Sequence, residues 1–164
     1  MVVSSLPPGA HDFDFLHGSW RIANKRLVSR LTRCDEWERF DAAGTCRPIL
    51  DGIGNIDDFR PASGGRQGFV GASIRIFNPA TELWSIFWAD NVLCDLTPPV
   101  IGHFVDGMGE LFGDDMHDGT SVQVRFWWSD ITTDALRWEQ AFSTDGGANW
   151  ETNWIMFFTR ERSQ

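Results

Sequence analysis

Three titratable side chains occupy positions from which a β-strand could direct them into an interior pocket. His103 lies within an apolar strand, and histidine is the side chain best suited to proton transfer near neutral pH. Glu38 shares a strand face with Phe40, and Asp90 ends an alternating aromatic row. A buried carboxyl group needs a partner or acquires a shifted pKa. His103, Glu38 and Asp90 are therefore candidate catalytic residues, with a hydrogen-bonded structural role as the alternative for His103.

A second group of residues combines aromatic rings with amide or guanidinium groups. Tryptophan supplies stacking area for an aromatic ligand, and a few polar groups can fix the orientation of that ligand. The candidate ligand-binding residues are Asn24, Arg47, Asn55, Trp88, Trp138, Gln140 and Trp154. The alternative interpretation is that the tryptophans form a structural wall.

The sequence lacks the motifs that are typical of several other activities. There is no G-x-S-x-G nucleophile elbow, no Walker loop and no G-x-G-x-x-G before a helix. The acidic segment 113–119 (GDDMHDG) combines oxygen ligands with one imidazole, but it lacks the spacing of an EF-hand or of an H-x-x-x-H zinc site. We interpret it as a solvated hairpin tip, and we expect neither a metal nor a cofactor.

The charge and the cysteines restrict partners and location. The chain has 14 Lys and Arg against 23 Asp and Glu, a net charge of −9 that disfavours nucleic acid and anionic membranes. No apolar run approaches the roughly 18 residues of a membrane-spanning helix. Three cysteines without a C-x-x-C pair or a secretory segment predict reduced thiols and a cytoplasmic location. A Cys34–Cys46 crosslink across a hairpin is the alternative.

The chain consists of short segments in which apolar and polar residues alternate, separated by D-G and N-P turn signals. Its 164 residues fit one domain, and nine Trp with thirteen Phe favour strands around a wide interior. Predicted strands are 20–30, 35–40, 46–50, 55–59, 69–77, 83–90, 100–105, 110–112, 121–129, 136–143 and 150–159. We expect residues 1–10 to form a flexible arm and residues 11–164 to form the folded domain. Within this domain, residues 11–17 are expected to form a helical turn that plugs one end of the barrel. About ten antiparallel strands without long helices predict an all-β barrel or sandwich.

Alternation along each strand assigns its two faces. The even positions of 70–76 are apolar and alternate with Ser73 and Arg75, so we expect even positions to face inward and Arg75 to face solvent. In the later strands the even positions carry most of the tryptophan. A face this bulky suits a barrel with a ligand cavity better than a thin sandwich.

Two sets of motifs resemble known proteins. Gly18-Ser-Trp20, together with Arg160, resembles the lipocalin kernel, in which a late arginine packs over the tryptophan. FDFLHGSW, DGIGNIDDF, FNPATELWSIFWA, VDGMGELFG, VRFWWSDIT and RWEQAFSTDGGANWETNWIMFFTR look like a bacterial family of uncharacterised lipocalin-like (calycin) proteins, from about Phe13 to Arg160. This resemblance implies a single lipocalin-like barrel and no particular reaction. The haem-binding nitrobindin branch needs a late proximal histidine, and no histidine follows His117.

The segment 143–150 (STDGGANW) resembles the Asp-box of sialidases, where an aspartate caps the backbone amides of a turn. In sialidases this element lies away from the catalytic site. We interpret it here as a hairpin clip built around Asp145, and not as a sign of glycosidase activity.

These observations favour a protein that binds a small, largely apolar aromatic or polycyclic molecule in a tryptophan-lined cavity. The alternative is a cofactor-independent enzyme, such as a cyclase, isomerase or lyase, in the same cavity. A cavity filled entirely by tryptophan is a third interpretation. Calycin barrels host both binding and catalysis, so the fold does not decide between them.

Four large apolar residues occupy odd positions that alternation assigns to the outer wall: Phe77, Phe87, Trp127 and Phe157. Soluble monomers rarely leave such a patch bare, so we expect a homodimer through this wall. The alternative is that the loop 60–68 or the N-terminal arm covers the patch.

Overall fold

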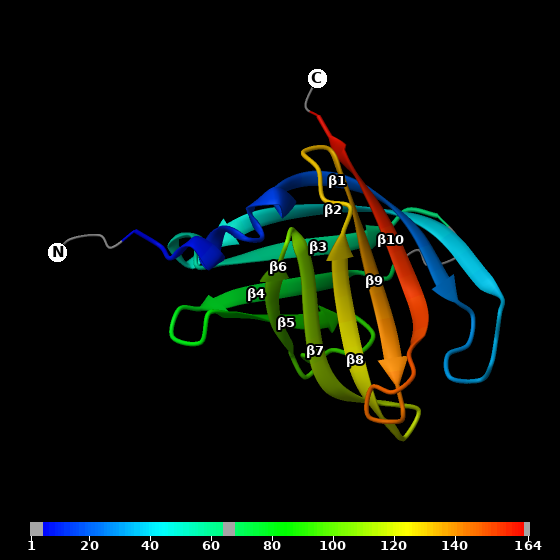
Figure 1. Ribbon diagram of the computed structural model, residues 1–164. Coiled ribbons are helices and arrows are strands. Elements are labelled where there is room, and N and C mark those ends of the chain that lie inside the picture. Colours follow the sequence, from blue (N-terminus) through cyan, green and yellow to red (C-terminus); the bar gives the residue numbers. More distant parts are fainter. Residues whose placement is uncertain (1–4, 64–67, 163–164) are drawn as a thin grey trace.

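Ten antiparallel strands form one closed barrel in the computed structural model, which describes residues 5–63 and 68–162 (Figure 1). Each strand pairs with its neighbour in sequence, and β1 pairs with β10 to close the ring. The strands are β1 (Gly18–Leu27), β2 (Trp37–Ile49), β3 (Gly54–Pro61), β4 (Gly71–Asn78), β5 (Leu83–Asp90), β6 (Val100–Val105), β7 (Met108–His117), β8 (Thr120–Ser129), β9 (Ala135–Ser143) and β10 (Glu151–Glu161). The predicted lipocalin-like barrel is confirmed.

Short 3-10 turns plug one end of this barrel. η1 (Pro8–His11) and η2 (Asp14–Leu16) precede β1, and a third turn, η3 (Leu50–Gly52), connects β2 to β3. Ala10 is buried, so part of the segment expected as a flexible arm already belongs to the plug; residues 1–4 lie outside the described residues. Figure 1 shows this N-terminal segment, in blue, at one end of the barrel.

Two predicted strands, 35–40 and 46–50, are one continuous strand, β2. The residues between them are small or polar and resemble a break, but burial alternates through them, with Phe40, Ala42 and Cys46 facing inward. A Cβ atom at Gly44 would lie 2.6 Å from the carbonyl oxygen of Asp58 on β3. The glycine therefore allows close strand contact and does not end the strand.

The register between β4 and β5 decides which face of β4 lines the interior. Ser73 lies opposite Trp88 and Arg75 opposite Ile86, and directly opposed residues of an antiparallel pair point to the same side. Because Ile86 is buried, Arg75 also faces inward and is only 3% exposed. The expectation that even-numbered residues face inward is therefore wrong for β4. It holds for the buried tryptophans of β5, β8 and β9. Apolar residues on the outer face of β4 made its two faces look alike.

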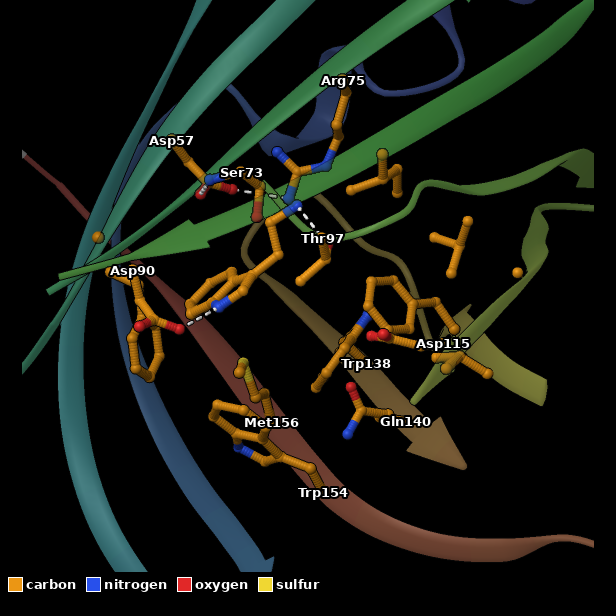
Figure 2. A pocket seen from close by; sticks show the side chains of 18 of the residues that line it. Asp57, Ser73, Arg75, Asp90, Thr97, Asp115, Trp138, Gln140, Trp154 and Met156 are labelled. Atoms are coloured by element: carbon orange, nitrogen blue, oxygen red, sulfur yellow. Dashed lines mark hydrogen bonds and ion pairs between the residues drawn. The ribbon is translucent and has the colours of Figure 1, made fainter. Parts of the chain in front are cut away.

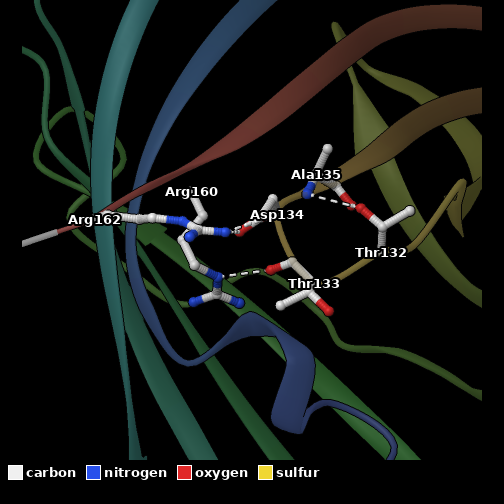
Figure 3. A network of polar contacts seen from close by, with 6 residues as sticks. All are labelled: Thr132, Thr133, Asp134, Ala135, Arg160 and Arg162. Carbon is white, nitrogen blue, oxygen red and sulfur yellow. Dashed lines mark hydrogen bonds and ion pairs between the residues drawn. The ribbon is translucent and has the colours of Figure 1, made fainter.

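Arg160, near the end of β10, fastens the plugged end. Its guanidinium group donates hydrogen bonds to the backbone carbonyls of Phe15 (2.7 Å), His17 (2.6 Å) and Thr133 (2.8 Å; the last in Figure 3). The same group lies 4.2 Å from the centre of the Trp20 ring. One side chain thus joins the last strand, the β8–β9 turn, the plug and β1, and the predicted contact between Trp20 and a late arginine is confirmed.

The predicted hairpin clip forms between β9 and β10. Asp145 accepts hydrogen bonds from the backbone N–H of Asn149 (2.9 Å) and from the Asn149 side chain (2.8 Å). Together with a bond from Ser143, these interactions lower the pKa of Asp145 to about 2. The carboxylate therefore serves the turn, as the sequence indicated.

The outer wall is less apolar than the sequence suggested. Phe77 is 2% exposed and packs against Trp84 inside the barrel, so its assignment to an outer patch is wrong for the same reason as for Arg75. Phe87 and Trp127 are partly buried, and Phe157 is 43% exposed. Arg137 covers one side of Phe157, 5.2 Å from its ring centre. Residues 64–67 of the loop expected to cover the patch lie outside the described residues.

The three cysteines, Cys34, Cys46 and Cys94, are free thiols, so the alternative Cys34–Cys46 crosslink is absent. Across 5–63 and 68–162, the helical segments are too short to cross a membrane.

We expect Trp20→Ala to lower the free energy of unfolding by about 3–5 kcal/mol, because it removes a buried ring and its cation–π partner. Urea denaturation followed by circular dichroism measures this loss. A decrease below about 1 kcal/mol would contradict the role of the Trp20–Arg160 contact in fastening the plug.

Candidate functional site

A cavity of about 760 Å³ occupies the barrel interior above the plug. Leu16 and Trp20 form its floor. At the opposite end its lining includes Val92 and Met116, which are 78% and 62% exposed, so the cavity reaches the surface there. The interior is therefore not filled by tryptophan.

Aromatic rings form much of the cavity wall. The predicted ligand-binding residues Trp88, Trp138 and Trp154 all line it. Figure 2 labels Trp138 and Trp154. The ring of Trp154 makes edge contacts with Trp138 at 5.8 Å and with Trp88 at 6.4 Å between ring centres. Phe59 adds a further edge contact to Trp154 at 6.0 Å. These contacts fix the rings against one another and leave a rigid apolar surface.

Polar residues hold Trp154 in place, of which Arg26 lines the cavity and Asn24 lies outside its lining. The Trp154 indole donates a 2.9 Å hydrogen bond to the side-chain oxygen of Asn24, which is 4% exposed. The guanidinium of Arg26 lies 4.8 Å from the Trp154 ring centre and 3.9 Å from the carboxylate of Glu38. Asn24 and Glu38, predicted as site residues, therefore support the wall and are not part of its lining.

Asp90 holds Trp88 and the loop that follows β5. Its carboxylate accepts hydrogen bonds from the Trp88 indole (2.8 Å) and from the backbone N–H groups of Val92 (3.0 Å) and Leu93 (2.6 Å). Burial alone would raise the pKa of Asp90, but these three hydrogen bonds outweigh it and lower the pKa. Asp90 lines the cavity as predicted, but its carboxylate positions its neighbours through these hydrogen bonds.

A buried ion pair that the sequence did not indicate lies beside the cavity. Arg75 donates hydrogen bonds to Asp57 (2.6 Å) and to the side-chain oxygen of Asn55 (2.9 Å; the Asp57 contact is drawn in Figure 2). Its guanidinium lies between the rings of Phe13 (5.5 Å) and Trp128 (5.3 Å). Asn55, predicted to contact a ligand, is 1% exposed and serves this ion pair instead. The sequence signal for this ion pair was the presence of two polar residues, Asn55 and Asp57, on the same face of the adjacent strand β3.

Two buried polar side chains line the cavity and have a hydrogen-bonding atom without a described partner. Gln140 is 9% exposed and donates its amide N–H to Asn153 (2.9 Å), which leaves its carbonyl oxygen without a described partner. Ser73 is 8% exposed, and within the described residues its hydroxyl makes no hydrogen bond. Gln140 was predicted as a binding residue, whereas Ser73 was missed with the face of β4. Both line the cavity.

Asp115 and His117 lie on the cavity side at the end of β7, where a solvated hairpin tip was expected. Figure 2 shows the Asp115 side chain directed into the cavity. His117 lies 5.5 Å from the Phe142 ring. Among residues 5–63 and 68–162, no three His, Cys, Asp or Glu side chains come together as a metal site.

Two predicted site residues do not reach the cavity. His103 and Arg47 are both exposed and lie outside its lining. His103 belongs to the outer face of β6, because its neighbour Gly102 opposes the buried Trp84. The prediction that His103 faces the interior is therefore wrong. Ile101 shares its face and is 43% exposed, so apolar neighbours did not mark the inner side.

The Cys46 thiol also lines the cavity. Burial raises its pKa to about 12, and the nearby charges of Arg75 and Asp57 act in opposite directions. The thiol is protonated at neutral pH and contributes mainly apolar surface.

The fold and the cavity define a lipocalin-like barrel with one plugged and one open end. Among solved structures, the S-type phycobiliprotein lyase CpeS from Guillardia theta is similar to this chain, with a TM-score of 0.59 and 14% sequence identity over 93% of this chain and 92% of that one. At this identity the likeness shows the fold alone. No family model matches the sequence, and neither does any curated protein.

We expect Asp57→Asn to lower the free energy of unfolding by about 3–5 kcal/mol, because it leaves the Arg75 charge buried without its counter-ion. Asp134→Asn is the matched control. Asp134 pairs with Arg162 on the surface at 2.6 Å, where both side chains are at least half exposed, and its loss should change the urea midpoint very little (Figure 3). Equal losses in the two variants would contradict the burial argument.

Proposed function

We propose that this protein binds a small, largely apolar aromatic or polycyclic molecule in the barrel cavity. The observation that carries the proposal is the cavity of about 760 Å³, which is walled by tryptophan and reaches the surface at one end. Ligand pockets of a few hundred to about 1,000 Å³ that combine apolar walls with a few polar groups are typical of small-molecule sites.

The rigidity of the wall supports this proposal. Trp154 is held by Asn24, and Trp88 by Asp90, at 2.9 and 2.8 Å. A ligand that stacks on these rings does not have to order them first, so less binding free energy is lost to side-chain immobilisation.

The alternative function, a cofactor-independent cyclase, isomerase or lyase, requires different residues from those predicted. Asp90 already accepts three hydrogen bonds, and His103 is exposed on the outer wall. An acid–base mechanism in this cavity would instead use His117 and Asp115, which share the inner face of β7. CpeS is a lyase, so an enzyme with a similar fold keeps this alternative open.

Binding can be tested with N-phenyl-1-naphthylamine, a neutral probe whose fluorescence rises in an apolar environment. We expect saturable binding at micromolar concentration, because the cavity offers aromatic stacking surface. Trp154→Leu should weaken this binding at least fivefold, since it removes a central wall ring.

Trp150→Leu is the control for the probe experiment. Trp150 does not line the cavity and packs against Phe112, at 5.9 Å between ring centres, and against Arg125. Its loss should leave the probe affinity unchanged. No saturable binding to the wild-type protein would overturn the proposal, and equal effects of the two variants would move the probe site out of the cavity.

We also propose that the protein is a homodimer through the outer wall near Trp127 and Phe157. Phe157 is 43% exposed, and its neighbours on the wall include arginines that could form a polar rim. Sedimentation equilibrium should give about twice the chain mass of 18.6 kDa, and Trp127→Glu should reduce it to one chain. A wild-type monomer at tens of micromolar would contradict this expectation.

A further inference from the structure

We infer that the ligand of this cavity carries a cationic or N–H-donating group that binds Asp115, and that the cavity discriminates against carboxylate ligands. This inference rests on the proposed binding function and adds the charge class of the ligand. It is carried by the charges and hydrogen-bonding groups of the described residues that line the cavity.

Each guanidinium group at the cavity has at least one protein partner, although the Nε–H groups of Arg26 and Arg75 are buried without a hydrogen bond to any described residue. Arg75 is paired with Asp57 at 2.6 Å and with Asn55, and Arg26 lies 3.9 Å from the Glu38 carboxylate. Arg30 lies over the Phe142 ring and likewise has partners. A carboxylate ligand would have to compete with Asp57 for Arg75 and with Glu38 for Arg26, at a cost in desolvation and lost ion pairs.

Asp115 differs from three of the other carboxylates that line the cavity, and the fourth, Asp114, is exposed. Asp57 is paired with Arg75, Asp58 with Arg60 at 2.9 Å, and the Asp90 carboxylate accepts three hydrogen bonds. Among the described residues, the Asp115 carboxylate accepts only the backbone N–H of Met116, at 2.7 Å, and has no cationic partner. It is partly buried on the inner face of β7 (Figure 2).

Two of the buried uncharged polar groups at the cavity, Gln140 and Ser73, point to the same ligand chemistry, whereas the indole N–H of Trp128 is a buried donor without a described partner. The carbonyl oxygen of Gln140 is a hydrogen-bond acceptor without a described partner, in a side chain that is 9% exposed. The Ser73 hydroxyl, in a side chain 8% exposed, can accept as well as donate. A ligand with N–H groups satisfies the Gln140 oxygen, the Ser73 hydroxyl and the Asp115 carboxylate, whereas a ligand with only acceptors leaves Gln140 and Asp115 unpaired.

Aromatic walls and net charge favour a cation further. The faces of tryptophan rings attract cations through their quadrupole and repel anions. The chain carries 14 basic and 23 acidic residues, a net charge of −9 that raises the local concentration of cationic ligands. The class that fits is a flat aromatic molecule with a protonated amine or with ring N–H groups.

Three anthracenes of nearly equal shape test this inference: 9-(aminomethyl)anthracene, a cation at neutral pH, 9-(hydroxymethyl)anthracene, and 9-anthracenecarboxylate. Affinities are measured by quenching of protein tryptophan fluorescence in low-salt buffer. We expect the amine to bind about tenfold more tightly than the alcohol, as a charge-assisted hydrogen bond does, and the carboxylate to bind most weakly. Added salt should reduce the preference for the amine.

Asp115→Asn and Asp118→Asn form a matched pair of variants for this test. Each removes one negative charge near the β7–β8 turn, but the Asp118 side chain is 91% exposed and does not line the cavity. We expect Asp115→Asn to abolish the preference for the amine while the alcohol affinity stays within twofold. Asp118→Asn should retain the preference, and Asp115→Glu, which keeps the charge, should retain most of it.

The outcomes separate this inference from the proposed function. If none of the three anthracenes binds to the wild-type protein, the proposed function fails and this inference fails with it. If the alcohol or the carboxylate binds as tightly as the amine, the cavity binds aromatic molecules but the inference is wrong. An equal loss of the preference in Asp115→Asn and Asp118→Asn also overturns it, because the effect is then one of overall charge.

Discussion

The structure depends on one guanidinium group at the plugged end of the barrel. Arg160 binds the carbonyl oxygens of Phe15, His17 and Thr133 and stacks over Trp20, so it fastens the last strand, the first strand and the N-terminal segment together. The pairing of β1 with β10 closes the ring of strands. Because a closed ring has no edge strand, every strand of the barrel pairs on both sides, and the cavity lies within this ring above the plug.

The walls of the cavity combine two kinds of interaction. Aromatic edge contacts pack the tryptophans against one another, and polar side chains fix the indole N–H groups of Trp88 and Trp154. A tryptophan whose N–H has a partner costs little to bury, and its ring keeps one orientation. The apolar surface is therefore held in place by two polar groups: Asn24, outside the cavity lining, and Asp90, which belongs to it.

The charges that line the cavity include ion pairs that the protein neutralises and a carboxylate, Asp115, without a described cationic partner. Arg75 can lie 3% exposed because Asp57 and Asn55 satisfy it and two aromatic rings flank it. Asp115, at the open end, has no such cationic partner among the described residues. The difference matters for recognition, because an unpaired charge in a partly dry cavity selects ligands more strongly than a paired one.

Local patterns in the sequence were enough to predict antiparallel strands, a helical plug and wall tryptophans, because alternation and turn pairs depend only on neighbouring residues. The single lipocalin-like barrel and the Trp20–Arg160 contact were expected from the resemblance to the lipocalin kernel. They were not enough for β4 and β6, which carry apolar residues on both faces. The tertiary structure alone decided that Arg75 lies inside and His103 outside. A buried arginine needs a counter-ion from another strand, and which strand supplies it is a matter of register, which no single strand encodes.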